Sequence, residues 1–131
     1  MDDSEALLAA NAAFYAAFNT RDADAMAAIW ATGEDVTCLH PGWPLLLGRE
    51  AVLASWWRIF AAGASPTVTC LEPHARPDRD GGLVVCYELI GAQRLAASNL
   101  FRREGGELRL HHHHAGPCAE APGEAPGTTR H

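Results

Sequence analysis

The sequence predicts a single α+β domain in which helices come first and antiparallel strands come last. In three segments before Phe60 the apolar residues recur at intervals of three and four, and from Thr67 on they recur at intervals of two. A length of 131 residues is enough to bury a core without disulfides or a structural metal. Helices followed by a run of strands are typical of the α+β class, with the helices packed on an antiparallel sheet.

Three N-terminal helices are expected, over residues 2–20, 22–33 and 49–63. Asp2 and Glu5 have the spacing of a capping box at the start of the first helix. The third helix contains two adjacent tryptophans, Trp56 and Trp57, which cannot both point the same way. One of them should therefore lie in the core, and the other should line the mouth of a cavity or stack on a ligand.

The other regular segments are expected to be extended, over residues 36–39, 44–48, 67–75, 83–90, 94–103 and 107–114. Pro73 removes a backbone donor, so its strand should lie at a sheet edge or carry a bulge. The strand over 83–90 is apolar on both faces, and each face therefore needs a cover. Helices would cover one face and a second subunit the other, so we expect a homodimer.

The last residues have a different composition from the rest of the chain. After Ala115 the sequence is rich in Pro, Gly, Ala and Glu and has too few apolar residues to pack. This change predicts one domain over residues 1–115 and a disordered tail over residues 116–131.

Composition excludes two classes of partner. The chain has 16 acidic and 10 basic residues, and the basic ones are scattered, so it lacks the footprint that nucleic acid requires. No apolar run reaches the length of a membrane span, and the N-terminus is acidic where a signal peptide would be basic. The four cysteines have no CxxC spacing and suit a reducing compartment. We expect a soluble, cytoplasmic protein.

The turn at residues 38–43 holds the main candidate for chemistry. Pro41 favours an extended conformation at His40, and Gly42 lets the chain turn directly afterwards. An imidazole is thus held at the end of a strand beside Trp43, and histidine titrates nearer to neutral pH than other side chains. His40 is our candidate general base or acid, and an ordinary turn residue is the competing interpretation.

Four consecutive histidines, His111 to His114, lie in the last strand, where at most two can face the same side. If the turn contains two residues, Asn99 lies opposite His112, and His112 and His114 face inward. A register shifted by one residue would turn His111 and His113 inward instead. We prefer the first register because it leaves the two arginines of this hairpin, Arg102 and Arg109, on the solvent side.

A metal-binding site is an alternative interpretation of these histidines. It would need His40 to meet His112 and His114, which would give three imidazole ligands with an open position. No carboxylate or cysteine spacing supports such a site. We expect neither a metal nor another cofactor.

Several motifs resemble those of a known family. They lie at residues 18–22, 39–42, 48–50, 56–57 and 112–116. With the order of the elements, they resemble the nuclear transport factor 2 like superfamily, and within it the SnoaL-like and ketosteroid isomerase-like domains, over about residues 3–116. The resemblance implies a cystatin-like cone: a strongly bent antiparallel sheet wrapped around the first helix, a pocket between sheet and helices, and commonly a homodimer through the outer sheet face.

The resemblance implies less about chemistry. Ketosteroid isomerases use an aspartate base with an oxyanion hole made by a tyrosine and a protonated aspartic acid. His40 occupies the place of the base, but the tyrosine falls on Phe14 and the aspartic acid falls near Ala96. Tyr15 points about 100° further around the helix and does not obviously substitute. The isomerase machinery is therefore absent as a set.

From these observations we expect a small-molecule-binding SnoaL-like domain. It would act as an isomerase, cyclase or hydrolase with His40 as general base in an apolar pocket. A non-catalytic, dimeric ligand-binding module is the alternative. The residues expected to line the pocket are Phe14, Phe18, Trp30, Trp43, Trp57, Asn99, His112 and His114.

Overall fold

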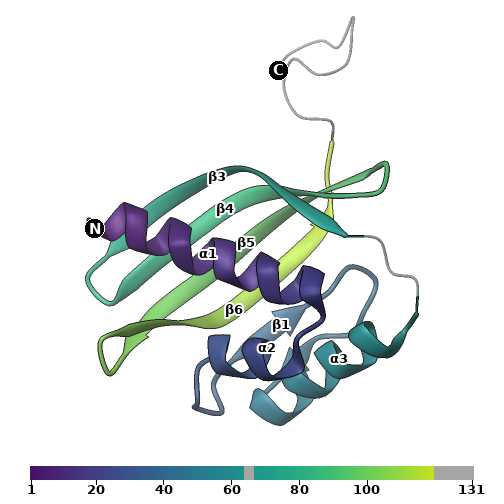
Figure 1. The fold of residues 1–131 in the computed structure, drawn as a ribbon, viewed down its shortest axis with the longest axis horizontal. Coiled ribbons are helices and arrows are strands. Elements are labelled where there is room, and N and C mark those ends of the chain that lie inside the picture. Colours follow the sequence, from purple (N-terminus) through teal and green to yellow (C-terminus); the bar gives the residue numbers. More distant parts are fainter. Residues whose placement is uncertain (64–66, 120–131) are drawn as a thin grey trace, which may run out of the picture.

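A computed structural model of the protein describes residues 1–63 and 67–119. Three helices pack against a mixed sheet with the strand order β2-β1-β6-β5-β4-β3 (Figure 1). The predicted α+β class, with helices packed on a sheet, is confirmed. The elements are α1 (Asp3–Thr20), α2 (Ala23–Ile29), β1 (Thr37–Leu39), β2 (Leu46–Leu47), α3 (Arg49–Ala61), β3 (Val68–Asp78), β4 (Gly81–Ile90), β5 (Gln93–Glu104) and β6 (Glu107–Pro117).

Helix α1 lies across the concave face of the long strands (Figure 1). Its capping box is present: the Asp2 carboxylate accepts the Glu5 backbone N–H at 2.8 Å, and the Glu5 carboxylate accepts the Asp2 N–H at 3.4 Å. Arg21 ends the helix in the left-handed conformation, with φ of 53°. These local signals fix both ends of the helix that covers the inner face of the sheet.

Strand β3 lies at one edge of the sheet, as Pro73 predicts. Its pairing with β4 shifts between Leu71 and His74, and Glu72 within this bulge has φ of 50°. Proline is tolerated at such a position because the edge and the bulge both remove the need for its missing donor.

The pairing of β1 departs from an all-antiparallel sheet. Strand β1 runs parallel to β6, so that Cys38 lies opposite His113, whereas the pairs β1–β2, β3–β4, β4–β5 and β5–β6 are antiparallel. This parallel contact carries the chain leaving β1, which includes His40, toward the middle of β6. It is the feature of the fold that assembles the site.

Strand β6 continues beyond the predicted domain boundary. Gly116 pairs with Ala96 and Pro117 with Leu95, so the tail cannot begin at residue 116. Backbone pairing along β5 holds these residues in the sheet although they contribute little apolar surface. The rest of the predicted tail, residues 120–131, lies outside the described residues.

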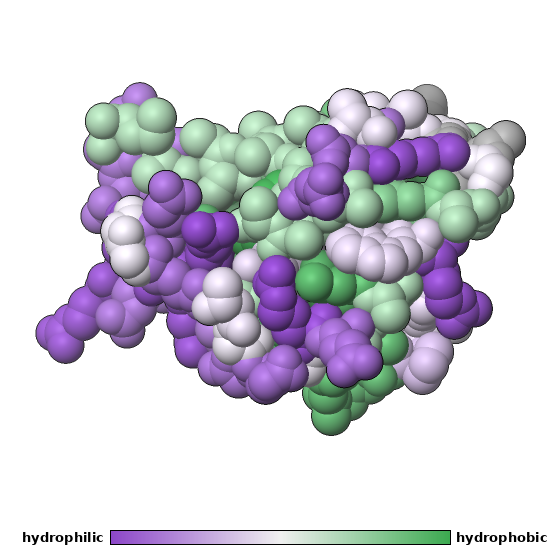
Figure 2. All heavy atoms as spheres, turned by 60° about the horizontal axis from the view of Figure 1, so that its bottom comes forward, coloured by the Kyte–Doolittle hydropathy of each residue, from purple (hydrophilic) through white to green (hydrophobic). Residues whose placement is uncertain are grey.

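The core lies between α1 and the inner sheet face. Trp56 of α3 is fully buried in it, whereas the side chain of Trp57 is 41% exposed, which confirms that only one of the two tryptophans is a core residue. On the face that carries α2 and α3, apolar and hydrophilic residues interleave over the surface (Figure 2). Within residues 1–63 and 67–119, no helix is long and apolar enough to cross a membrane.

Candidate functional site

A bulge in the last hairpin decides which histidine enters the core. Phe101 lies opposite Leu110, as the two-residue turn predicts, but the pairing then shifts and leaves His111 as an extra residue. Asn99 consequently pairs with His113, so the predicted pairing of Asn99 with His112 is wrong. Each residue of β6 after the bulge faces the opposite side from the one predicted.

The two histidines expected in the pocket lie elsewhere. His112 pairs with Leu100 on the other face of the sheet, and its Nδ1 contacts the Thr37 hydroxyl. His114 is exposed and lines a groove on the outer sheet face. The buried imidazole is that of His113, which is 1% exposed. Of the two registers considered from the sequence, only the one that we did not prefer turned His113 inward.

His40 is held by a short chain of hydrogen bonds. Its Nε2 lies 2.8 Å from Ser55 Oγ, and Ser55 Oγ lies 2.6 Å from the Val52 carbonyl oxygen. The serine proton must lie between the two oxygens, so Ser55 accepts the Nε2–H of His40. Neutral His40 is therefore the Nε2–H tautomer, and its Nδ1 keeps the lone pair that can accept a proton.

Aromatic side chains surround the His40 ring. Its centroid lies 4.7 Å from that of Trp56, 5.1 Å from that of Trp43 and 6.2 Å from that of His113. The side chain is 6% exposed, and burial lowers the pKa of His40 to about 4. The imidazole is consequently neutral at pH 7, as a general base must be before it acts.

Next to His40 lies a group of five buried polar side chains, which we call the inner polar cluster: Asn11, Tyr15, Glu88, Asn99 and His113. The Tyr15 hydroxyl donates to Glu88 Oε2 at 2.7 Å. The Asn99 amide donates to Asn11 Oδ1 at 2.8 Å and to the Tyr15 oxygen at 3.2 Å. Asn99 Oδ1 can only accept, so His113 Nδ1, at 2.6 Å, donates to it.

This bond leaves His113 Nε2 unprotonated and facing Glu88 Oε2 at 3.9 Å. Burial lowers the pKa of His113 well below its usual value and raises the pKa of Glu88, although the hydrogen bond from Tyr15 opposes the second shift. Both net shifts favour the uncharged forms, so burial disfavours a doubly charged ion pair between these two groups. Burial and the nearby Glu88 also raise the pKa of Tyr15, which keeps its hydroxyl a donor.

Three members of the cluster carry weak signals in the sequence. Glu88 shares the inner face of β4 with Val84 and Cys86, so it is a carboxyl group on a strand face that packs against a helix. Asn11 and Tyr15 are four residues apart and so share one face of α1. The sheet curves around α1 closely enough that Phe14 and Tyr15 are both buried, with ring centroids 4.7 Å apart.

The structure brings together only part of the predicted pocket. Phe14 and Phe18 pack on Trp56, with ring centroids 5.6 and 5.1 Å from it, and Trp43 packs on His40. Asn99 joins the site through His113. Trp30 is buried beside Leu110 at the other end of β6. The predicted residues that lie away from His40 are Trp30, Trp57, His112 and His114.

A metal site through these histidines is not formed, since His112 and His114 do not face His40. Over the two ranges that the structure describes, no group of three or more His, Cys, Asp or Glu side chains could hold a metal ion.

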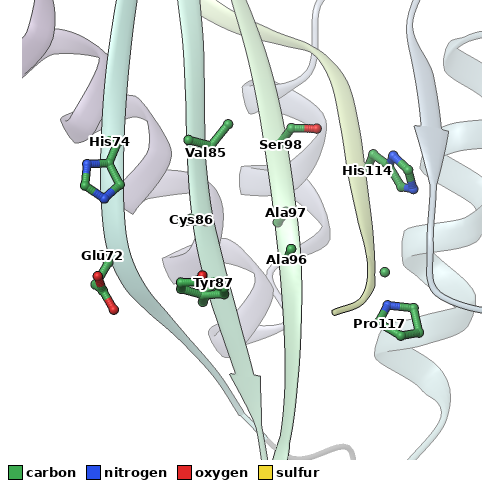
Figure 3. Close-up of a pocket in the computed structure, with 11 residues that line it drawn as sticks. Glu72, His74, Val85, Cys86, Tyr87, Ala96, Ala97, Ser98, His114 and Pro117 are labelled. Carbon is green, nitrogen blue, oxygen red and sulfur yellow. The ribbon is translucent and has the colours of Figure 1, made fainter. Parts of the chain in front are cut away.

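The outer face of the sheet carries a groove of about 630 Å³. Figure 3 shows the side chains of His74 on β3, Tyr87 on β4, Ser98 on β5 and His114 on β6 along its length. The small side chain of Ala96 on β5, opposite Tyr87, leaves the groove open where four strands lie side by side. It is separated from the inner polar cluster by the thickness of the sheet.

The sequence model of the SnoaL-like domain family matches residues 7–120, and the chain belongs to this family. A Streptomyces avermitilis protein of the nuclear transport factor 2 like family, for which a dehydratase activity has been suggested, is 33% identical; the match covers 90% of this chain and 97% of that one, with a TM-score of 0.77. A Thiobacillus denitrificans protein, suggested to be a calcium/calmodulin-dependent protein kinase type II association domain, is 38% identical over 85% of this chain and 94% of that one, with a TM-score of 0.69.

More distant relatives agree on the fold. A Shewanella frigidimarina protein suggested to be a ketosteroid isomerase has a TM-score of 0.71 at 13% identity, over 84% of this chain and 94% of that one. The F-box protein SKIP8 of Arabidopsis thaliana is 24% identical over 86% of this chain. The chain spans about half the length of that curated relative, 49%. The resemblance to SnoaL-like domains of the nuclear transport factor 2 like superfamily is thus confirmed, and the Shewanella protein shares their fold.

Proposed function

We propose that this domain binds a small molecule and catalyses a proton transfer on it, with His40 as the general base. One observation carries the proposal: the His40 imidazole is buried, neutral and fixed through Nε2, so that Nδ1 is available as the proton acceptor. Isomerisation and loss of water both begin by removing a proton from carbon. The relative at 33% identity for which a dehydratase activity has been suggested supports this reaction class.

The inner polar cluster supplies the acid side of the proposed reaction. Burial raises the pKa of Glu88, which favours its protonated form, and the bare Nε2 of His113 faces Glu88 Oε2 at 3.9 Å. The His113 ring lies 6.2 Å from the His40 ring, so a base and a proton donor converge on one small region. Groups held neutral by burial are suited to stabilise negative charge that develops on a ligand oxygen.

The proposed entry to the site is the turn that carries Trp43. His40 retains 6% exposure there, whereas Trp56 behind it has none. Trp43 is half-buried, and the Arg58 guanidinium lies 5.0 Å above its ring. A ligand would reach His40 by displacing Trp43, because Ser55 and Trp56 of α3 and His113 of β6 pack against the ring from other sides.

The test has two steps. Native mass spectrometry of freshly purified protein identifies a ligand, and turnover of that ligand is then compared in wild type, His40→Asn and a control, His74→Asn, which alters an exposed histidine on the outer face. His40→Asn should keep the fold and lose most of the turnover, while His74→Asn should retain it. Undiminished turnover in His40→Asn would refute the role of His40 as base.

A second candidate is a non-catalytic, dimeric ligand-binding module. The open groove on the outer sheet face favours it, as does the relative at 38% identity suggested to be an association domain. A second copy packed on this face would cover the half-buried Val85 and Tyr87. Light scattering should then give twice the 14.0 kDa mass of the chain. A monomeric mass at micromolar protein concentration would contradict the dimer.

A further inference from the structure

Two imidazoles of the last strand lie together on the outer face of the sheet. His112 and His114 are two residues apart on β6, so their side chains leave the strand on the same side. Their ring centroids lie 6.4 Å apart, and the rings are inclined to each other by 68°. The histidine between them, His113, points to the inner face and is buried. The strand therefore presents one pair of imidazoles away from His40 and from the proposed reaction.

The neighbouring strand orients one ring of this pair. The Nδ1 atom of His112 contacts the Thr37 hydroxyl across the parallel pairing of β1 with β6. When the hydroxyl accepts the Nδ1–H, the lone pair of the neutral ring lies on Nε2. Metal-ligating histidines in proteins are oriented by this kind of hydrogen bond to the second ring nitrogen. His114 is exposed, so its ring can turn toward His112 without displacing core residues.

The separation of the two rings suits a metal ion held between them. A metal ion bonded to a ring nitrogen at about 2.1 Å lies about 3.2 Å from the ring centroid. Two rings that share an ion at a tetrahedral angle therefore have centroids about 5.2 Å apart, and rings on opposite sides of the ion have centroids about 6.4 Å apart. The observed 6.4 Å lies at the upper end of this range, and a small rotation of His114 covers the rest of it.

We propose that His112 and His114 form a binding site for a late divalent transition-metal ion, with Cu²⁺ bound most tightly. Imidazole nitrogen is a good ligand for copper, nickel and zinc, and Cu²⁺ has the highest affinity of these divalent ions for a given site. The two imidazoles fill two coordination positions, and water fills the others from the outer face. The site has two protein ligands, in agreement with the lack of a group of three or more ligating side chains over residues 1–63 and 67–119.

The alternative is that the four-histidine tract binds metal as a flexible chain, in which any two imidazoles can serve. The folded strand makes a different prediction because it separates the four side chains. His111 is the extra residue at the bulge, and its Nε2 lies 2.9 Å from a carboxylate oxygen of Asp35. His113 is 1% exposed and donates its Nδ1–H inside the inner polar cluster. This leaves His112 and His114 as the two members of the tract that can share an ion.

The main experiment titrates the whole chain with Cu²⁺ at neutral pH by isothermal titration calorimetry. The electron paramagnetic resonance spectrum of the complex with one equivalent of Cu²⁺ then identifies the bound nitrogens. Wild type should bind one ion through two imidazole nitrogens. His114→Ala changes an exposed residue and should keep the fold, and its affinity should fall at least about tenfold because one point of attachment is lost.

Two matched controls should bind Cu²⁺ as tightly as wild type. His111→Ala removes a neighbour in the same tract, and His74→Ala removes an exposed histidine on β3, at the far side of the groove. Thr37→Val keeps the shape of the side chain and removes the hydroxyl that orients His112. It should weaken binding by about tenfold and still give two bound nitrogens, which separates loss of orientation from loss of a ligand.

Three results would overturn the proposal: an unchanged affinity in His114→Ala, equal losses in His111→Ala and His114→Ala, or a wild-type spectrum with a single imidazole nitrogen. Equal losses would show that the tract binds as a flexible chain and holds an adventitious ion only. An unchanged affinity in Thr37→Val would contradict the orienting role of the hydroxyl.

Discussion

Truncation of Trp56 tests both the core and the environment of His40. The Trp56 ring is fully buried and packs on Phe14, Phe18 and His40, with centroid distances of 5.6, 5.1 and 4.7 Å. Trp56→Ala should cost about 3–5 kcal/mol of unfolding free energy, because a large core side chain is lost and its cavity collapses only in part. With a urea m-value of about 1.5 kcal/mol/M, the unfolding midpoint should fall by roughly 2–3 M.

The matched control is Trp57→Ala, since Trp57 is the neighbour on the same helix and is 41% exposed. Its substitution should cost less than about 1 kcal/mol. Trp56→Ala should also admit water beside His40, which weakens the desolvation and raises the pKa of His40 from about 4 toward 6.5. Urea unfolding and NMR titration measure the two effects. Equal, small losses in both variants would show that the buried face of α3 is misassigned.

Three further predictions concern the buried polar groups. The folded-state pKa of His40 is depressed, so below pH 6.5 the unfolded state binds more protons than the folded state. As the pH falls from 6.5 to about 4, wild type should lose about 3 kcal/mol of unfolding free energy relative to His40→Asn. Urea midpoints that change with pH by the same amount in both proteins would contradict this. Glu88→Gln should be at least as stable as wild type at pH 8, because it removes the cost of burying an ionisable carboxyl. Glu88→Ala should lose about 1–3 kcal/mol, because the Tyr15 hydroxyl loses its acceptor at Glu88; equal thermal midpoints would contradict both expectations. Ser55→Ala removes the acceptor of the His40 Nε2–H and should lower the unfolding free energy by about 1–2 kcal/mol, measured by urea unfolding. An unchanged unfolding free energy would show that this hydrogen bond does not stabilise the fold.

Features set by local rules could be predicted from the sequence. The Asp2 cap depends on residues three apart, and the bulge at Pro73 follows from the missing backbone donor of proline. The turn after His40 belongs to the same group, since Pro41 and Gly42 restrict the backbone at their own positions. The conformational preference behind each of these features is determined by residues that are close together in the sequence.

Features set by contacts across the chain could not be predicted. The turn correctly placed Phe101 opposite Leu110, but the extra residue His111 follows from packing on both faces of β6 and reverses the later side chains. A carboxyl on the inner face of a strand is costly, and Glu88 is tolerated there because Tyr15, 73 positions earlier in the chain, donates a hydrogen bond to it. No local pattern at Glu88 indicates that partner.

The most direct test of the proposed site is an NMR titration of the imidazole nitrogens in the ligand-free protein. The structure predicts that His40 remains the neutral Nε2–H tautomer throughout the neutral range and titrates with a midpoint of about 4, while exposed His74 provides an internal reference. A His40 midpoint near 6.5, or a proton on Nδ1 instead of Nε2, would contradict the claim that this imidazole is held ready as a base.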